Sequence, residues 1–190
     1  MRFKPGGRWM SFTATQEYDT RTVAFSWKAR FRVAPMIWIT VIDEYRGGVG
    51  ALEAQLWGFI RVMRASGPDL SKGEVSRYLG ELFWTPFSIA ANEELRWEVD
   101  PAGATMVTTD VDGEEVSVRF SFDADSVEVS MPARPRQVGK ESIDTPWHGR
   151  AWEFVSIGGL SLPRRAAVSW DLPDGRFEYF EGRITQVAWS

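Results

Sequence analysis

The sequence predicts a mainly β protein: a large curved antiparallel sheet or half-open barrel of about eleven strands, with one or two helices packed on the concave face. Three observations support this prediction. Short segments of alternating apolar and polar residues recur along most of the 190 residues, and turn residues separate them. The stretch 71–91 has helical spacing instead. The chain also has 10 Trp and 12 Phe, which a sheet and a helix can bury between them in a single domain, 1–190.

The strands before the helix follow from the alternation. In TVAFSWKARF the apolar residues fall on one face and Lys28 and Arg30 on the other, which is the period of a half-buried strand. WMSFTATQEY precedes this strand, and MIWITVIDEY follows it. We expect ALEAQLWGFIRVM to be one long strand, with Gly58 at a bulge or a close backbone approach.

The helix is predicted from residue 71 onward. Ser71 and Glu74 have the spacing of a capping box, and Leu70 and Val75 that of a hydrophobic staple. Pro86 should bend the chain, with a second short helical turn after it, so that a helical plug covers about 71–91. The residues expected to be buried are Val75, Tyr78, Leu79, Leu82 and Phe83, and those expected on the wet side are Ser76, Arg77, Gly80 and Glu81.

The second half of the chain alternates again. Its predicted strands are ELRWEV, ATMVTTDV, EVSVRFSF, SVEVSM, WHGRAWEFVSI, AAVSWDL and FEYFEGRITQVAW. DVDGEE has acidic residues near the spacing of a calcium loop, but its context favours a hairpin. The segment 132–146 reads as a long loop, which either gates a cavity, meets an anionic group or is an ordinary mobile loop.

Composition narrows the classes of function. The formal net charge of −4 and the lack of a basic run argue against nucleic-acid binding. With no cysteine, disulfides, thiolate nucleophiles and Cys-based metal sites are excluded. No familiar nucleotide, metal or hydrolase motif is present, so neither a cofactor nor a metal is expected. We expect a cytoplasmic chain without a transmembrane segment, or a membrane-associated or envelope protein if the chain is a fragment; its oligomeric state stays open.

Several motifs together resemble an uncharacterised family. FTATQ, FSWKARF, DEYRGGVG, RYLGELFWTPF, PWHGRAWEF and LPRRAAVSW are similar to a bacterial domain of unknown function, over nearly the whole chain. Members of that family often carry N-terminal hydrophobic segments, which this sequence lacks. The inferred shape also resembles the lipoprotein-carrier fold of the bacterial envelope, a likeness of architecture alone.

The aromatic residues and a few polar ones suggest a site for an apolar or amphipathic small molecule such as a lipid or fatty acid. The alternatives are an enzyme of unknown reaction with His148 as acid or base, and a protein-interaction domain that uses a sheet edge or an aromatic patch. No single residue is assigned a catalytic role, although His148 is the candidate. For each aromatic residue taken alone, ordinary core packing is the simpler interpretation. The predicted ligand-binding residues are Trp38, Asp43, Tyr45, Trp57, Tyr78, Phe83, Trp84, Phe87 and Trp147.

Overall fold

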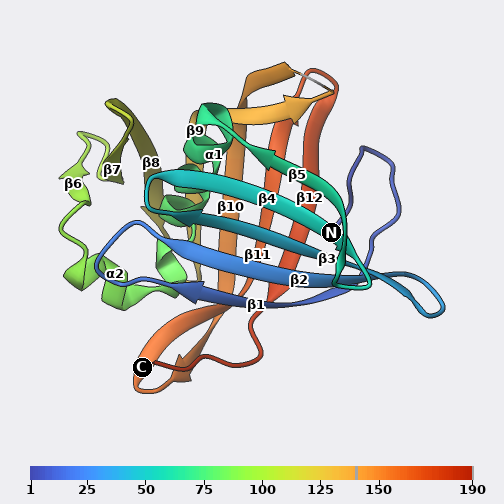
Figure 1. Ribbon diagram of the computed structural model, residues 1–190. Helices are drawn as coiled ribbons and strands as arrows, with labels where there is room; N and C mark the ends of the chain where they lie inside the picture. Colours follow the sequence, from blue (N-terminus) through green and yellow to red (C-terminus); the bar gives the residue numbers. More distant parts are fainter. Residues whose placement is uncertain (140, 190) are drawn as a thin grey trace.

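A computed structural model describes residues 1–139 and 141–189 and contains two antiparallel sheets with helices between and beside them (Figure 1). Strands make up 61% of the chain and helices 12%, so the mainly β prediction is confirmed. Neither sheet closes into a barrel. The first sheet has five strands in chain order: β1 (Phe12–Tyr18), β2 (Phe25–Ala34), β3 (Ile37–Arg46), β4 (Val49–Leu56) and β5 (Ile60–Ser66).

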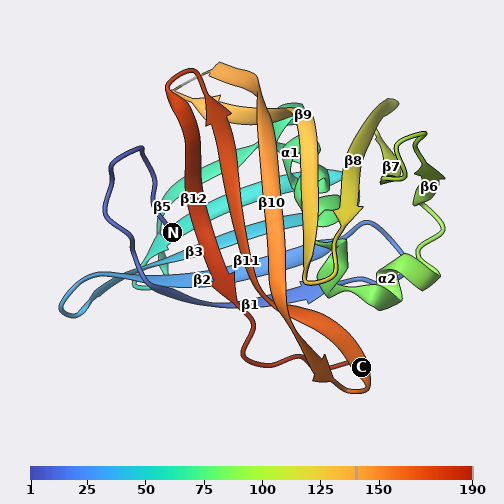
Figure 2. The same ribbon diagram turned by 180° about the vertical axis from the view of Figure 1, so that it is seen from behind.

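The second sheet has seven strands, which also follow one another in chain order. Its strands cross those of the first sheet at a steep angle, and the two sheets face each other (Figure 2). This arrangement gives the molecule one interior between the sheets. The strands are β6 (Arg96–Val99), β7 (Thr105–Val111), β8 (Glu114–Phe122), β9 (Ser126–Val138), β10 (Glu141–Ile157), β11 (Leu160–Leu172) and β12 (Gly175–Arg183).

Helix α1 (Pro68–Gly80) lies in the interior, packed against β4 on one side and against β8 and β9 on the other. A 3₁₀ turn, Leu82–Trp84, and helix α2 (Pro86–Ala91) continue from it, so the predicted bend at Pro86 and the second short helix are confirmed. The predicted start at Ser71 is wrong. The helix begins with Pro68 in its first turn after Gly67, whose φ of 141° suits a residue without a side chain.

Ser71 therefore does not cap the helix. Its hydroxyl accepts a hydrogen bond of 2.9 Å from the backbone N–H of Gly50 in β4. A Cβ atom on Gly50 would lie 2.7 Å from Cα of Ser71, so the strand and the helix touch backbone to backbone at this point. This contact fixes the N-terminal half of α1 against the first sheet.

The helix is buried on more of its surface than its apolar stripe predicts. Val75, Tyr78, Leu79 and Leu82 are fully buried, as expected. The predicted wet side is wrong: Ser76 and Gly80 are buried, with Gly80 close to Met131 and Trp147 of the second sheet, and Arg77 and Glu81 are largely covered by strands of the first sheet.

In two segments the secondary structure differs from the prediction. The expected strand ALEAQLWGFIRVM is a hairpin, because Trp57 and Gly58 both have positive φ and turn the chain between β4 and β5. The expected loop 132–146 is the end of β9 and the start of β10, paired from Val138 with Glu141 to Arg134 with Thr145, and residue 140 within it lies outside the described residues. The prolines in this stretch obscured its strand character, although strands accept proline near a bulge such as the one between Thr145 and Trp147.

Candidate functional site

On the inner face of the first sheet, the side chains become more exposed from β2 towards β5. Directly paired residues share a face, so the register defines rows across the sheet. One row runs from Phe31, which is 2% exposed, through Ile39 and Leu56 to Ile60, which is 43% exposed. The sheet thus presents apolar side chains to the interior that no other element fully buries.

A second row shows the same trend. Ala29 is completely buried, Val41 is partly exposed, Ala54 is 7% exposed and Met63 is 45% exposed. The close backbone contact of α1 with β4 is at Gly50, towards the other end of that strand. The inner face is therefore covered by α1 at one end of β3 and β4 and more exposed at the other.

A polar cluster lies where the plug begins. The guanidinium of Arg77 on α1 donates to Asp43 on β3 at 2.5 Å and to Glu81 at 2.9 Å. All three side chains are largely buried, with exposed fractions of 15%, 13% and 17%. The same guanidinium lies over the ring of Trp27, 4.8 Å from its centre. Arg77 therefore holds two carboxylates on a mostly apolar inner surface.

Glu74 adds a third acid to this cluster. One helical turn before Arg77, it is 6% exposed. Burial raises the pKa of Glu74 well above its ordinary value of 4.5, and the nearby Asp43 carboxylate raises it further. The protonated form of Glu74 is favoured in the folded state, because two adjacent buried carboxylates cannot both be ionised cheaply.

The cluster extends to β1. The phenol of Tyr18 donates to Glu81, and Gln16 donates to the same carboxylate at 2.7 Å. Burial, followed by the charge of Glu81, raises the pKa of Tyr18 well above 10.0, so this group stays a phenol and a donor. Strands β1 and β3 and the helix are thus tied together by one set of charged and polar groups.

Arg134 on β9 is a second buried cation. It is 8% exposed and donates to the carbonyl of Gly73 at 3.0 Å and, more weakly, to the phenol of Tyr179 at 3.4 Å. Its guanidinium lies between the rings of Trp147 and Trp170, 5.1 and 5.4 Å from their centres. None of the ion pairs in the described part of the chain includes it, so its charge is balanced by rings and dipoles.

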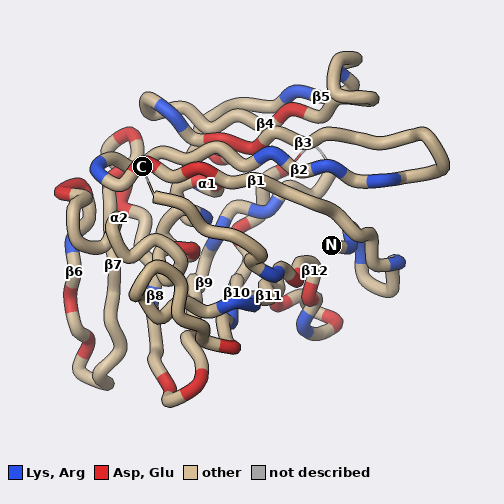
Figure 3. The backbone as a smooth tube through the Cα atoms, turned by 90° about the horizontal axis from the view of Figure 1, so that it is seen from below, with Lys and Arg blue, Asp and Glu red and all other residues tan. Residues whose placement is uncertain are grey.

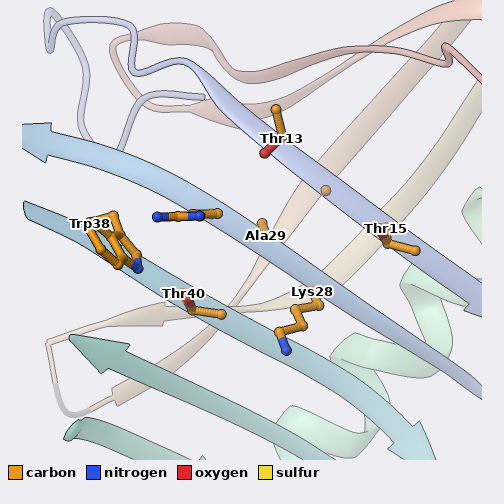
Figure 4. A pocket seen from close by; sticks show the side chains of 8 residues that line it. Thr13, Thr15, Lys28, Ala29, Trp38 and Thr40 are labelled. Atoms are coloured by element: carbon orange, nitrogen blue, oxygen red, sulfur yellow. The ribbon is translucent and has the colours of Figure 1, made fainter. Parts of the chain in front are cut away.

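Two predicted ligand residues do not face the interior. Trp38 lies on the outer face of the first sheet, in the row of Arg32, and the guanidinium of Arg30 stacks on it at 4.1 Å. It lines a shallow groove of about 370 Å³ with Thr13, Thr15 and Lys28 (Figure 4). Trp57 is 39% exposed in the β4–β5 turn. The sequence could not show which face of β3 looks inward, nor that a turn falls at Trp57.

The remaining predicted aromatic residues pack in different ways. Tyr78 is fully buried and hydrogen-bonds through its hydroxyl to Asn92, and Trp84 donates to the carbonyl of Pro163 at 2.7 Å. Phe83 packs edge-on against Trp84, 4.8 Å away. These three join the helical plug to the core.

Phe87 is outside this group, 43% exposed on α2 and in contact with Trp189. Tyr45 and Trp147 are core residues, 6% and 3% exposed. Of the nine predicted ligand residues, Asp43 is the one that the polar cluster contains.

His148 lies on the outer face of the second sheet, away from the polar cluster. Its Nε2 is 2.7 Å from Oδ2 of Asp171, and Oδ1 of the same carboxylate accepts from Arg176 at 2.8 Å. The hydrogen bond from Arg176 is the main cause that lowers the pKa of Asp171, and His148 adds to it. Ser169 is the direct cross-strand neighbour of His148. His148, Ser169 and Arg176 line a groove of about 330 Å³.

Sequence reasoning missed Glu74, Arg77 and Arg134. A signal for the first two was present, because Glu74, Arg77 and Glu81 are spaced i, i+3 and i+7 on one helical face. Arg134 gave no such signal, since it stood in an expected loop. The partners Asp43 and Tyr18 are far away in the sequence, so only the fold reveals the cluster.

Within the described residues, no helix is long and apolar enough to cross a membrane. In residues 1–139 and 141–189, no group of three or more His, Cys, Asp or Glu side chains could hold a metal ion.

Comparison with known proteins places the chain in a family. Residues 1–189 match the model of a family of unknown function (DUF6920), so the chain belongs to that family. No curated protein and no solved structure shows significant similarity to it. The likeness to lipoprotein carriers stays a prediction.

Proposed function

We propose that this member of the DUF6920 family binds an apolar or amphipathic small molecule, of the lipid or fatty-acid class, between the inner face of the first sheet and helix α1. The observation that carries the proposal is the pair of apolar rows that end in Ile60 and Met63, 43% and 45% exposed. Inner-face apolar side chains of a curved sheet are normally buried, and their exposure suits a hydrophobic ligand.

The polar cluster suits the other end of an amphipathic ligand. Asp43 is two residues after Val41 on the same face of β3, so the open apolar rows lead directly to Arg77 and its carboxylates. Mostly apolar pockets with a few polar groups are typical of small-molecule sites. The helical plug would then form the closed end of the site, and β5 its rim.

A matched pair of variants tests this proposal. Met63→Gln changes the inner face, whereas Arg64→Gln changes the next residue, which pairs with Glu53 on the outer face. Both positions are exposed, so both variants should fold. Titration of oleate, followed by tryptophan fluorescence, should show affinity about tenfold weaker for Met63→Gln, since about 1–2 kcal/mol of apolar contact is lost. Arg64→Gln should bind like the unmodified protein.

Equal affinity of the two variants would contradict the position of the site. Absence of any fluorescence change with oleate, lysophospholipid and a long-chain alcohol would contradict the proposal itself. Circular dichroism of each variant is the control for folding.

A second candidate function is enzymatic, and the pairing of His148 with Asp171 favours it. A carboxylate that holds one ring nitrogen orients the imidazole, and the other nitrogen can then accept a proton. If the groove is catalytic, a broad hydrolase substrate screen should detect turnover that His148→Ala abolishes and Asp171→Asn reduces. Turnover that persists in His148→Ala, or its absence throughout the screen, would reject this role.

A further inference from the structure

Three segments meet at one end of the first sheet. Phe3 of the N-terminal segment packs on Phe31 of β2, with ring centres 6.0 Å apart. Trp57 of the β4–β5 turn donates through its indole N–H to the carbonyl of Met36 in the β2–β3 turn at 3.1 Å. Figure 1 shows the N-terminal segment and both turns together at the end of the sheet away from α2. We call residues 1–11, 30–38 and 57–64 the basic aromatic end.

Large apolar side chains are unusually exposed at this end. Met36 is 83% exposed, Phe59 75%, Phe3 67% and Trp9 46%. Each of them lies in a turn or in the N-terminal segment rather than within a strand. Aromatic rings and a methionine at the tips of neighbouring loops form a surface that can insert into an apolar environment outside the protein, without unfolding of the sheet.

The charges at this end are all of one sign. Residues 1–11, 30–38 and 57–64 contain seven Arg and Lys and no Asp or Glu, whereas the whole chain has a formal net charge of −4. Arg61 pairs with Glu53 at 3.0 Å, and Arg2 packs on Trp9 at 5.0 Å. Lys4 and Arg8 are exposed. Figure 3 shows these basic positions along the N-terminal segment, β2 and β5.

We infer that the basic aromatic end docks on the surface of an anionic lipid bilayer. Trp and Phe side chains enter the interfacial region, and Lys and Arg remain at the level of the anionic headgroups. Each basic residue near such a surface contributes about 1 kcal/mol, so several are enough for reversible attachment. An acidic chain would otherwise be repelled by this surface, and the seven basic residues of these three segments offset that repulsion locally.

This docking surface is distinct from the ligand site, although the two adjoin. Ile60, at the rim of the apolar rows, is the neighbour of Phe59 in the β4–β5 turn. A bilayer in contact with Phe59 would therefore face the open end of the interior. Docking needs only the exposed rings and charges, so it can be measured without any bound small molecule.

Vesicle co-sedimentation tests the inference. Vesicles of phosphatidylglycerol and phosphatidylcholine should pull down the protein, and vesicles of phosphatidylcholine alone should do so weakly. The double variant Lys4→Gln/Arg8→Gln should bind anionic vesicles about 25-fold more weakly, about fivefold for each charge removed. Phe59→Ser should also weaken binding, about tenfold, and high salt should weaken the attachment of the unmodified protein.

Matched controls lie outside this end. Phe122→Ser removes a ring that is 64% exposed in the second sheet, and Arg21→Gln removes an exposed charge in the β1–β2 turn. Both controls should bind vesicles normally. Equal loss in control and test variants, or no preference for anionic vesicles, would overturn the inference. So would a dimer in light scattering that Phe59→Ser dissociates while vesicles bind nothing, because a second copy would then be the occupant.

Discussion

Replacement of Arg77 by methionine should destabilise the protein more than any exposed charge deletion. The change leaves Asp43 and Glu81 without their shared cation, in places where their side chains are only 13% and 17% exposed. Removal of one partner of a buried pair costs about 3–5 kcal/mol, because the remaining charge is uncompensated. These side chains keep some contact with water, so we expect about 3 kcal/mol.

Arg96→Met is the matched control. Arg96 also contacts two carboxylates, Asp110 and Glu115, but all three side chains are exposed, by 47%, 54% and 69%. Water and salt screen exposed ion pairs, so this variant should lose far less stability than Arg77→Met. Both substitutions keep an unbranched apolar chain, which limits the lost packing.

Urea denaturation followed by tryptophan fluorescence measures the difference. With a slope of about 2 kcal/mol/M, the loss of 3 kcal/mol lowers the midpoint of Arg77→Met by about 1.5 M. Equal losses in Arg77→Met and Arg96→Met would refute this reasoning.

Three other predictions concern the same helix. Glu74→Gln mimics the protonated acid. The folded-state pKa of Glu74 is raised, so the stability of the unmodified protein falls as the pH rises above about 4.5. The variant's advantage in urea midpoint should therefore be near zero at pH 4.5 and grow by pH 8, and a constant difference would contradict this prediction. Gly50→Ala places a methyl group 2.7 Å from Cα of Ser71 and should lower the free energy of unfolding, measured in denaturant, by about 3 kcal/mol. In Gly73→Ala the new methyl group meets its nearest atom at 3.9 Å, so this variant should gain about 0.5–1 kcal/mol. The reverse order of stability would be inconsistent with the packing. Tyr18→Phe removes a donor to buried Glu81 and should cost about 1–3 kcal/mol, and an unchanged melting curve would show that water replaces it.

The strands were predictable because the alternation of side chains is a local property of the sequence. Phe25, Trp27 and Phe31 lie on one buried face of β2, as their spacing predicts. The hairpin at Trp57 was missed because an aromatic residue at positive φ gives no usual turn signal. Helical periodicity alone assigned Arg77 to the wet side, whereas its true environment among β1, β2 and β3 depends on tertiary packing.

The candidate site was predictable only in part. The sequence pointed to Asp43, which lies in the polar cluster, and to the aromatic residues of the plug, of which Tyr78 is fully buried and Phe87 is 43% exposed. It could not pair Asp43 with Arg77, 34 positions away, since that contact depends on how α1 crosses β3. The exposure of Met63 on the inner face likewise depends on where the helix ends, a property of tertiary packing.

Native mass spectrometry of the gently purified protein, followed by solvent extraction, tests the central proposal most directly. The proposal that the interior holds an amphipathic molecule predicts a stoichiometric adduct, with oleate added if the purified protein is empty. The adduct should persist in Arg64→Gln and weaken in Met63→Gln. A mass equal to the bare chain under all these conditions, with oleate in excess, would contradict the proposal.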